Sequence, residues 1–254
     1  MRITEKLLRK NILTYYISRY LYSIFFTKFF FEPDCEVFKF LKKKNKIKII
    51  DIGASDGSFS KYLSTIFRNS NFYCFEPLNE FYQKFYLTIN NKLKIYNFAL
   101  SNKTNKLKIY TPFKTFFGKK LFLKFFSSTN KKFIKANLNK YFGSSKNFKY
   151  KATIVKAISG DYFKLAPDII KIDVENYEYE VLIGLKKTIK KYKPIIFIEN
   201  PNKKIDNFFY KNKYLKFQYL RKQNKLKKIK SNNFNTYNYL YIKNFRNFKK
   251  NLFI

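Results

Sequence analysis

The stretch Ile47–Leu63, IKIIDIGASDGSFSKYL, places two of the chain's six glycines within five positions. A β-branched apolar run precedes the glycines, and Phe59 and Leu63 follow them at helical spacing. This order predicts a strand, a tight turn and a helix, with the turn at the carboxyl end of the strand, where open α/β sheets bind ligands. Glycine permits positive φ and has no Cβ, so we expect a ligand to lie against the backbone amides of this turn.

Further along the chain, short apolar runs alternate with amphipathic segments, a pattern typical of strands and helices in a parallel sheet. The last two apolar runs are predicted as antiparallel strands, with the basic stretch 221–233 as the loop between them. The Lys- and Phe-rich stretch 112–150 is predicted only as an insertion. The predicted strands are 47–51, 71–77, 92–100, 106–113, 150–158, 167–176 with its loop, 193–200, 213–220 and 236–244, and the predicted helices are 59–67, 78–89 and 177–192.

The chain of 254 residues carries a formal net charge of +38, from 48 Lys and 6 Arg against 16 acidic residues. Arg is the residue that forks onto phosphates and base edges, so this Lys excess favours a genome rich in A and T over selection for nucleic-acid binding. A field this positive would still attract anionic polymers or membrane surfaces.

The chain has no His, and Cys35 and Cys74 are its only cysteines. His-based triads, His metal clusters and a disulfide framework are therefore excluded, and any residue that moves a proton must be Asp, Glu, Lys, Tyr or Cys. We expect no metal site and a protein of the reducing cytoplasm.

Residues 1–45 contain an aromatic run that superficially resembles a signal peptide or membrane span. Arg19 and Lys28 interrupt it, so it lacks the ~20 consecutive apolar residues that a membrane span needs. We expect an N-terminal helical segment that packs on the main domain, residues 46–254. An interfacial helix at the inner membrane surface is the open alternative.

The chemistry of the first turn differs from that of a phosphate loop. It lacks the GxxxxGK[ST] pattern, and Asp51 and Asp56 would repel a pyrophosphate. Glu76, at the end of the second predicted strand, can accept hydrogen bonds from both ribose hydroxyls. A ribose, no phosphate and a positive centre describe S-adenosylmethionine. The alternative is that these acids cap helices or pair with lysines.

The segments DIGASDGSFS, CFEP, NFALSN, KIDVENYEYEVLIG and FIEN together resemble the FkbM family of S-adenosylmethionine-dependent methyltransferases. Ser55 stands where the family commonly has Asn, and Asn176 where it commonly has Gly. The resemblance implies a class I, Rossmann-like methyltransferase fold of the α/β class. In this fold a mostly parallel seven-stranded sheet ends with a C-terminal antiparallel strand, and helices cover both faces.

The resemblance also implies roles for individual residues. Glu76 matches the acid that binds the ribose, and Asn97 and Ala99 match the region near the adenine. The residues that match the cofactor loop are Asp51, Gly53, Ala54, Ser55 and Gly57.

The segment after the fourth strand of the family pattern carries the expected catalytic acids. Asp173 and Glu175 are two positions apart and face the same side if both are extended, so one could accept the proton of an attacking hydroxyl. Glu175 could instead be a helix-start acid. A structural ion pair is favoured for Lys171. Glu199 could reach the acceptor, and the serine pair at 127–128 falls where the family often has one.

The activity implied is O-methylation of a hydroxyl on a sugar, glycan or small metabolite, with S-adenosylmethionine as cofactor. Two alternatives stay open: an RNA or DNA methyltransferase, and a catalytically silent basic nucleic-acid-binding protein with the same fold. Against the first, DVEN stands where adenine-modifying enzymes carry an Asn- or Asp-Pro-Pro-aromatic loop. Through its lysines the protein could also contact anionic polymers or a membrane surface. The sequence leaves the acceptor and the oligomeric state open.

Overall fold

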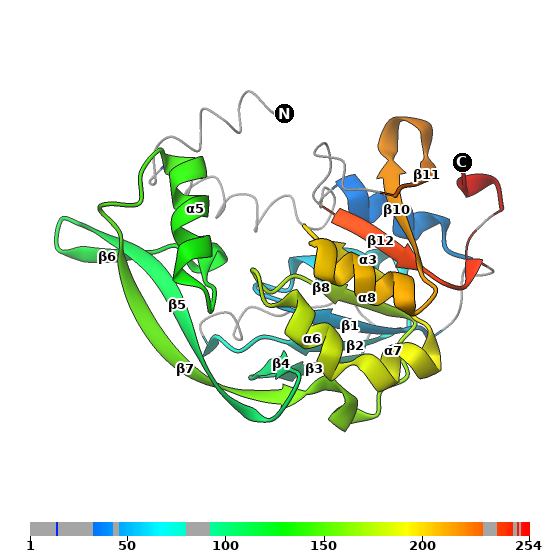
Figure 1. Cartoon of the computed structure of the whole chain (residues 1–254), viewed down its shortest axis with the longest axis horizontal. Helices are drawn as coiled ribbons and strands as arrows, with labels where there is room; N and C mark the ends of the chain where they lie inside the picture. Colours follow the sequence, from blue (N-terminus) through cyan, green and yellow to red (C-terminus); the bar gives the residue numbers. More distant parts are fainter. Residues whose placement is uncertain are drawn as a thin grey trace.

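The computed structural model describes residues 14, 33–42, 46–79, 92–230, 238–245, 248 and 250–254 (Figure 1). The helix predicted at 78–89 and most of the N-terminal segment 1–45 lie outside these residues, so both stay predictions. Within the described part, no helix is long and apolar enough to cross a lipid bilayer.

The main sheet has eight strands in the order β11-β10-β12-β9-β8-β1-β2-β3. The five strands from β9 to β3 run parallel, whereas β12 is antiparallel to both of its neighbours, β9 and β10. This confirms the mostly parallel α/β sheet and the antiparallel pair near the C-terminus. The strands are β1 (Lys48–Ile52), β2 (Asn71–Phe75), β3 (Lys92–Tyr96), β8 (Ile169–Ile172), β9 (Ile195–Glu199), β10 (Leu215–Leu220), β11 (Lys225–Lys228) and β12 (Asn238–Ile242).

The prediction of seven strands is wrong by one, because β11 forms inside the stretch predicted as a loop. It pairs with β10 as a hairpin across a 3-10 turn, η5 (Arg221–Gln223), and Asn224 at φ 50 reverses the chain. Leu226 is fully buried, but it is the one apolar residue in β11 and lysines surround it. A strand of four residues with one apolar side chain does not show the alternation of apolar and polar residues by which a strand is predicted.

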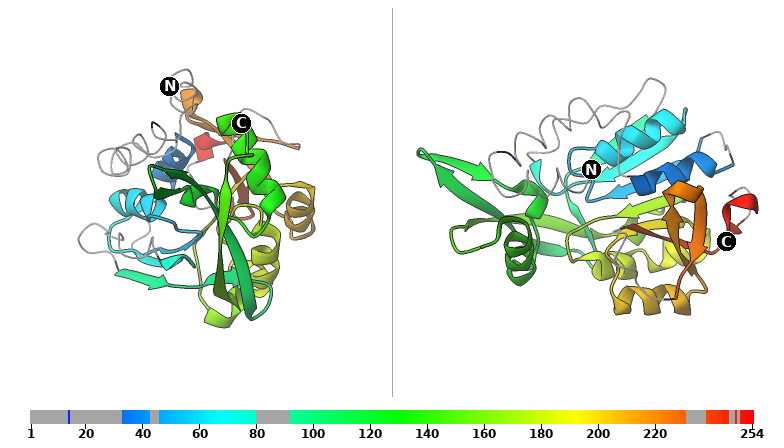
Figure 2. Two further views of the ribbon diagram at one scale, coloured as in Figure 1. Left: turned by 90° about the vertical axis from the view of Figure 1, so that its left-hand side faces the viewer. Right: turned by 90° about the horizontal axis from the view of Figure 1, so that it is seen from above.

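Helices cover both faces of the main sheet, as predicted (Figures 1 and 2). On one face, α3 (Ser58–Ile66) and the 3-10 helix η2 (Pro33–Phe40) bring Phe59 and Phe38 against Phe197 of β9. On the other face, the helices bury residues such as Val181, Leu182, Ile189 and Phe209. The helices on that face are α6 (Glu178–Gly184), α7 (Lys186–Tyr192) and α8 (Lys203–Lys211).

The single helix predicted at 177–192 is in fact two, α6 and α7, which meet at Leu185. The carboxylate of Asp161, in the 3-10 helix η4 (Gly160–Phe163), accepts hydrogen bonds from the backbone N–H groups of Lys187 and Thr188 at 2.9 and 2.8 Å. A capping acid that binds the first turn of α7 from an element distant in sequence starts a new helix there. No local pattern predicts it.

A second sheet, in the order β4-β7-β5-β6, extends away from the main sheet together with one helix (Figures 1 and 2). We call residues 99–159 the arm. The stretch 112–150, predicted only as an insertion, contributes strands to this sheet, and its buried residues Leu123, Phe126, Ile134, Leu138 and Phe148 form a separate small core. The elements of the arm are β4 (Ala99–Ser101), β5 (Asn105–Phe116), β6 (Lys119–Phe122), η3 (Lys124–Phe126), α5 (Lys131–Phe142) and β7 (Lys149–Ser159).

Candidate active site

The glycine turn joins the carboxyl end of β1 to α3. Gly53 lies at φ 73, and a Cβ there would come within 1.8 Å of the backbone oxygen of Asp173. The N–H groups of Gly53 and Ala54 donate to the carbonyl of Phe75 at 3.0 and 3.2 Å. These two amides are therefore used within the protein: they tie the turn to β2, and the glycine lets the end of β8 approach. Gly53 and Ser55 still line a pocket, so a ligand against the turn stays a prediction.

Gly57 completes the turn. It lies at φ 76 as the N-cap of α3, and its N–H donates to the carbonyl of Ala54 at 2.8 Å. The second glycine thus closes the loop and starts the helix.

Glu76 follows β2, and its side chain is fixed at both oxygens. Oε2 accepts from the N–H of Ser55 at 2.9 Å and Oε1 from the N–H of Leu78 at 2.8 Å. The residue is only 5% exposed, and this burial raises its pKa to about 7. Asn97 donates from its side chain to the backbone carbonyl of Glu76 at 3.0 Å, so it braces the acid.

Asp51 lies fully buried below the turn and is not among the residues that line the pocket. It accepts a hydrogen bond from Ser60 at 2.7 Å, and Lys171 Nζ lies 3.5 Å from its other oxygen. Burial raises the pKa of Asp51, and the neighbouring Lys171 opposes that rise. The structure thus places Asp51 beneath the predicted cofactor loop, where it contacts Ser60 of α3 and Lys171 of β8.

Lys171 links three parts of the site. Its Nζ donates to the carbonyl of Gly53 at 3.1 Å and lies 3.2 Å from Asp173 Oδ2, in addition to its contact with Asp51. The ion pair favoured from the sequence is confirmed. It fixes the glycine turn and the carboxylate of Asp173 relative to each other.

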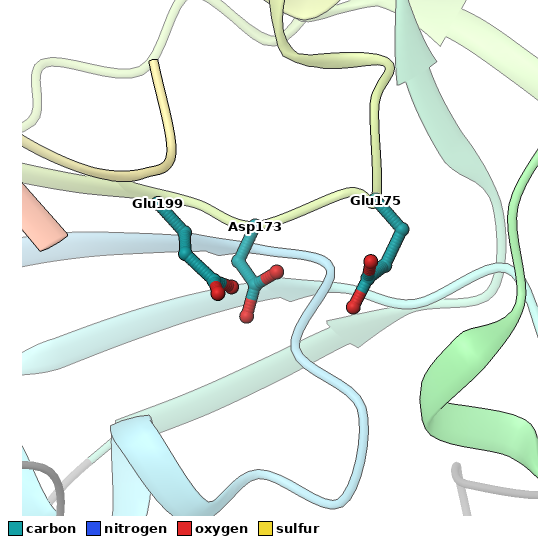
Figure 3. Close-up of side chains that lie close together, drawn as sticks. All are labelled: Asp173, Glu175 and Glu199. Atoms are coloured by element: carbon teal, nitrogen blue, oxygen red, sulfur yellow. The ribbon is translucent and has the colours of Figure 1, made fainter. Parts of the chain in front are cut away.

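Three carboxylates meet where β8 and β9 end: those of Asp173, Glu175 and Glu199 (Figure 3). One oxygen of each lies within 4.8 Å of the others. The backbone at Glu175 is not extended, since its φ is 52, and yet its carboxylate still turns towards Asp173. Such a cluster of oxygens could also take a divalent cation, a site that the sequence did not predict.

Burial raises the pKa of Glu175 well above its usual range, and the charges of Asp173 and Glu178 add to the rise. The pKa of Glu178 is itself raised to about 7 by burial. Burial therefore favours the protonated form of Glu175, and a positive charge beside it would oppose that effect.

A pocket joins these residues between the main sheet and the arm. Gly53, Ser55, Glu76, Asp173 and Glu175 line it on one side, and Ala99, Leu107, Ile109 and the serine pair at 127–128 line it from the arm. Ser128 Oγ donates to the backbone carbonyl of Glu175 at 2.5 Å, and Ser127 Oγ lies 2.9 Å from Thr111 Oγ1. The arm therefore forms one wall of the pocket and holds the loop that carries Glu175.

The model of one protein family, described as the methyltransferase FkbM domain, matches residues 51–225. No curated protein matches the sequence. Among solved structures, the FkbM methyltransferase from Methylobacillus flagellatus KT is 14% identical with a TM-score of 0.45. The match covers 78% of this chain and 43% of that chain. This protein thus spans less than half of that relative.

Two other methyltransferases give weaker likenesses. The precorrin-6y C5,15-methyltransferase from Geobacter metallireducens GS-15 is 14% identical, with a TM-score of 0.34 over 81% of this chain and 84% of that chain. An rRNA methylase from Streptococcus thermophilus is 9% identical, with a TM-score of 0.36 over 82% of this chain and 90% of that chain. These scores are too low to support an argument. The family match rests on most of the sequence, including the glycine turn, Glu76 and both acids after β8, and on this basis the chain belongs to the FkbM family of methyltransferases.

Proposed function

We propose that this protein transfers a methyl group from S-adenosylmethionine to a hydroxyl oxygen of a sugar, glycan or small metabolite. The observation that carries the proposal is Glu76, a buried carboxylate held at both oxygens at the wall of a pocket. A carboxylate oxygen has two lone pairs, and each oxygen of Glu76 accepts one backbone N–H. The lone pairs that are left match the two hydroxyls of a ribose.

A second polar atom supports the fit of the cofactor. Ser55 Oγ is buried and has no hydrogen-bond partner among the described residues. A buried hydroxyl without a partner is costly, so a polar ligand group beside the loop would satisfy it. Ser55 lines the same pocket as Glu76, whose side chain accepts its N–H.

Bound S-adenosylmethionine would supply a methyl group on a positively charged sulfur. Asp173 and Glu175 line the pocket, so their charges would favour a cation there. Displacement at a methyl carbon depends mainly on holding the reacting atoms in line. The ion pair of Lys171 with Asp173 and the bond from Ser128 to Glu175 both serve this positioning.

Glu175 is the residue that best suits the role of proton acceptor. A carboxylate whose pKa is raised is a stronger base than an ordinary one, and general bases work best near the operating pH. As the hydroxyl oxygen attacks, its proton would pass to Glu175, while Lys171 holds the neighbouring carboxylate of Asp173 in place through a contact of 3.2 Å. The cation brought in by the cofactor would lower the pKa of Glu175 and keep it ready to accept that proton.

The choice of a hydroxyl acceptor rests on the resemblance to the family and on the loop after β8. That loop reads DVEN, and the sequence Asn200-Pro201 follows β9 without an aromatic residue after it. The loop therefore lacks the parts with which adenine-modifying enzymes hold a base.

Calorimetry with S-adenosylmethionine tests the cofactor site. We expect Glu76→Gln to weaken binding by about tenfold or more, because a charged acceptor is lost and the amide NH₂ would face a backbone N–H. Glu180→Gln is the matched control, since Glu180 lies on α6 outside the pocket lining and should bind as the wild type does. Equal affinity of all three proteins, or no binding by the wild type, would refute the proposal.

Incubation with labelled S-adenosylmethionine and separate glycan, lipid and RNA fractions tests the acceptor. We expect the label in the glycan or small-metabolite fraction as a methyl ether. Label on RNA bases would refute the hydroxyl assignment while leaving the cofactor site intact.

A further inference from the structure

The charges of this protein are divided unevenly between the arm and the main domain. The arm carries fifteen lysines and no Asp, Glu or Arg, so all sixteen acids lie elsewhere. Codon bias towards A and T supplies lysines and also lowers the number of acids, whose codons begin with G, but it acts along the whole chain. A uniform bias therefore does not by itself place all sixteen acids outside the stretch of 80 residues from 81 to 160.

The lysines of the arm do not serve the pocket. Thirteen of the fifteen are exposed, and among the described residues only Lys124 lines the cavity. The pocket wall that the arm supplies consists mainly of apolar and hydroxyl side chains. The positive charge of the arm therefore lies on its outer surface, where it can contact a macromolecule or a membrane.

The turn between β5 and β6 lies at the end of the arm (Figures 1 and 2). It carries exposed aromatic side chains. Phe117 is fully exposed at φ 45, and the neighbouring Phe116 is 37% exposed. Lys114 Nζ lies 5.2 Å from the centre of the Phe116 ring, and Lys119 and Lys120 follow the turn directly. This turn therefore exposes apolar rings to water, and the ammonium groups of Lys114, Lys119 and Lys120 lie close to them in the chain.

We propose that the arm docks on an anionic lipid bilayer, with Phe117 entering the headgroup layer and the lysines behind it contacting anionic headgroups. Aromatic rings partition into the membrane interface, and basic residues near an anionic leaflet add attraction. The rings lie at the tip of the turn and the lysines follow them in the chain. This arrangement matches a bilayer, in which the anionic headgroups lie outside the apolar interior. A nucleic acid would favour Arg, which the arm lacks.

Vesicle sedimentation at physiological ionic strength tests the docking. The full-length wild type should bind vesicles of phosphatidylcholine mixed with phosphatidylglycerol, and should bind pure phosphatidylcholine weakly. Phe117→Ser should reduce the partition coefficient by about tenfold or more, because the loss of a buried Phe has that effect. Tyr210→Ser is its control, since Tyr210 is 82% exposed on α8. Equal loss in both variants would overturn the proposal.

A charge-matched pair separates the arm from the overall field of the protein. Lys119→Gln with Lys120→Gln should lower binding to the anionic vesicles by about tenfold or more. Lys186→Gln with Lys187→Gln removes the same charge from α7, where both side chains are exposed, and should have a small effect. Similar losses in the two double variants would show that net charge alone drives binding and would overturn the proposal.

The depth of the turn can be read directly because the chain has no Trp. Phe117→Trp introduces a single Trp, which can be excited selectively over the 22 Tyr, and its emission should shift to the blue and be quenched by brominated lipid when anionic vesicles are added. Tyr210→Trp should show neither change. Loss of RNA binding in Phe117→Ser with unchanged vesicle binding would assign the arm to nucleic acid and overturn the proposal. None of these readouts depends on methyl transfer.

Discussion

Removal of the Lys171 ammonium group should unfold this protein more readily, and in a way that depends on pH. In Lys171→Met the fully buried Asp51 keeps its hydrogen bond from Ser60 and loses the cation 3.5 Å away. Met keeps most of the apolar stem of the side chain. The variant removes the ammonium group, and with it the hydrogen bond to the carbonyl of Gly53 and the cation near the ring of Phe59.

The magnitude follows from the burial of the pair. The Lys171 side chain is 11% exposed and that of Asp51 is 0% exposed. Removing one partner of a buried ion pair costs about 3–5 kcal/mol, because the remaining charge has neither water nor a counterion. The contact with Asp173 adds little, since that carboxylate is 33% exposed.

The pH dependence has a definite sign. Burial already raises the pKa of Asp51, and loss of the lysine should raise it further. Folded Lys171→Met therefore binds a proton at Asp51 more tightly than the folded wild type does. The destabilisation should be largest at about pH 8 and should shrink towards about pH 5, as Asp51 becomes neutral.

Urea unfolding followed by circular dichroism measures the free energy of unfolding at both pH values. In an Asp51→Asn background the same Lys171→Met change should cost at least about 2 kcal/mol less, because no buried charge is stranded. A loss below about 1 kcal/mol at the higher pH, or a loss equal in the two backgrounds, would refute the reasoning.

Two further predictions concern the fold. Gly53→Ala should destabilise the protein by about 3–5 kcal/mol, because its Cβ would lie 1.8 Å from a carbonyl oxygen. Gly118→Ala, at a similar φ of 72 with open space around it, should cost only about 1–2 kcal/mol, and thermal unfolding compares the two. The wild-type free energy of unfolding should fall as pH rises from about 4.5 to about 7, because burial raises the pKa of Glu76 and Glu178 to about 7. Urea unfolding at several pH values across that range measures how steeply the free energy of unfolding falls with pH. Glu178→Gln should make this fall smaller, and a free energy that does not change with pH would contradict the prediction.

Sequence pattern was sufficient for the main sheet because its central strands are buried on both faces. The runs KIIDI, IIKI and IIFIE are almost continuously apolar and end in acids or in the glycine turn, which marks both the strands and the edge where they meet. Asp173 and Glu175 could be predicted to lie together because both directly follow one of these buried runs.

Contacts between residues distant in sequence were beyond the reach of that pattern. Asp51 reads as a loop acid, and only the fold shows that Ser60 and Lys171 enclose it. Glu199 joins the carboxylate cluster because β9 lies beside β8. Two strands of the arm, β5 and β7, were predicted, but β6, η3 and α5 were not, because lysines alternate irregularly with aromatics there and the small core forms only when η3 and α5 pack together.

The bond from Ser128 to the carbonyl of Glu175 joins two halves of the pocket that have separate origins. One half is built from the ends of β1, β2 and β8, and the other is carried by the arm, with its own small core. Substitutions at arm residues that line the pocket, such as Leu107 and Ile109, can therefore change that wall while the turn and the ion pair keep their own contacts. Under the proposed function, a different acceptor could be accommodated by changes in the arm, while the half that carries Glu76 stays as it is.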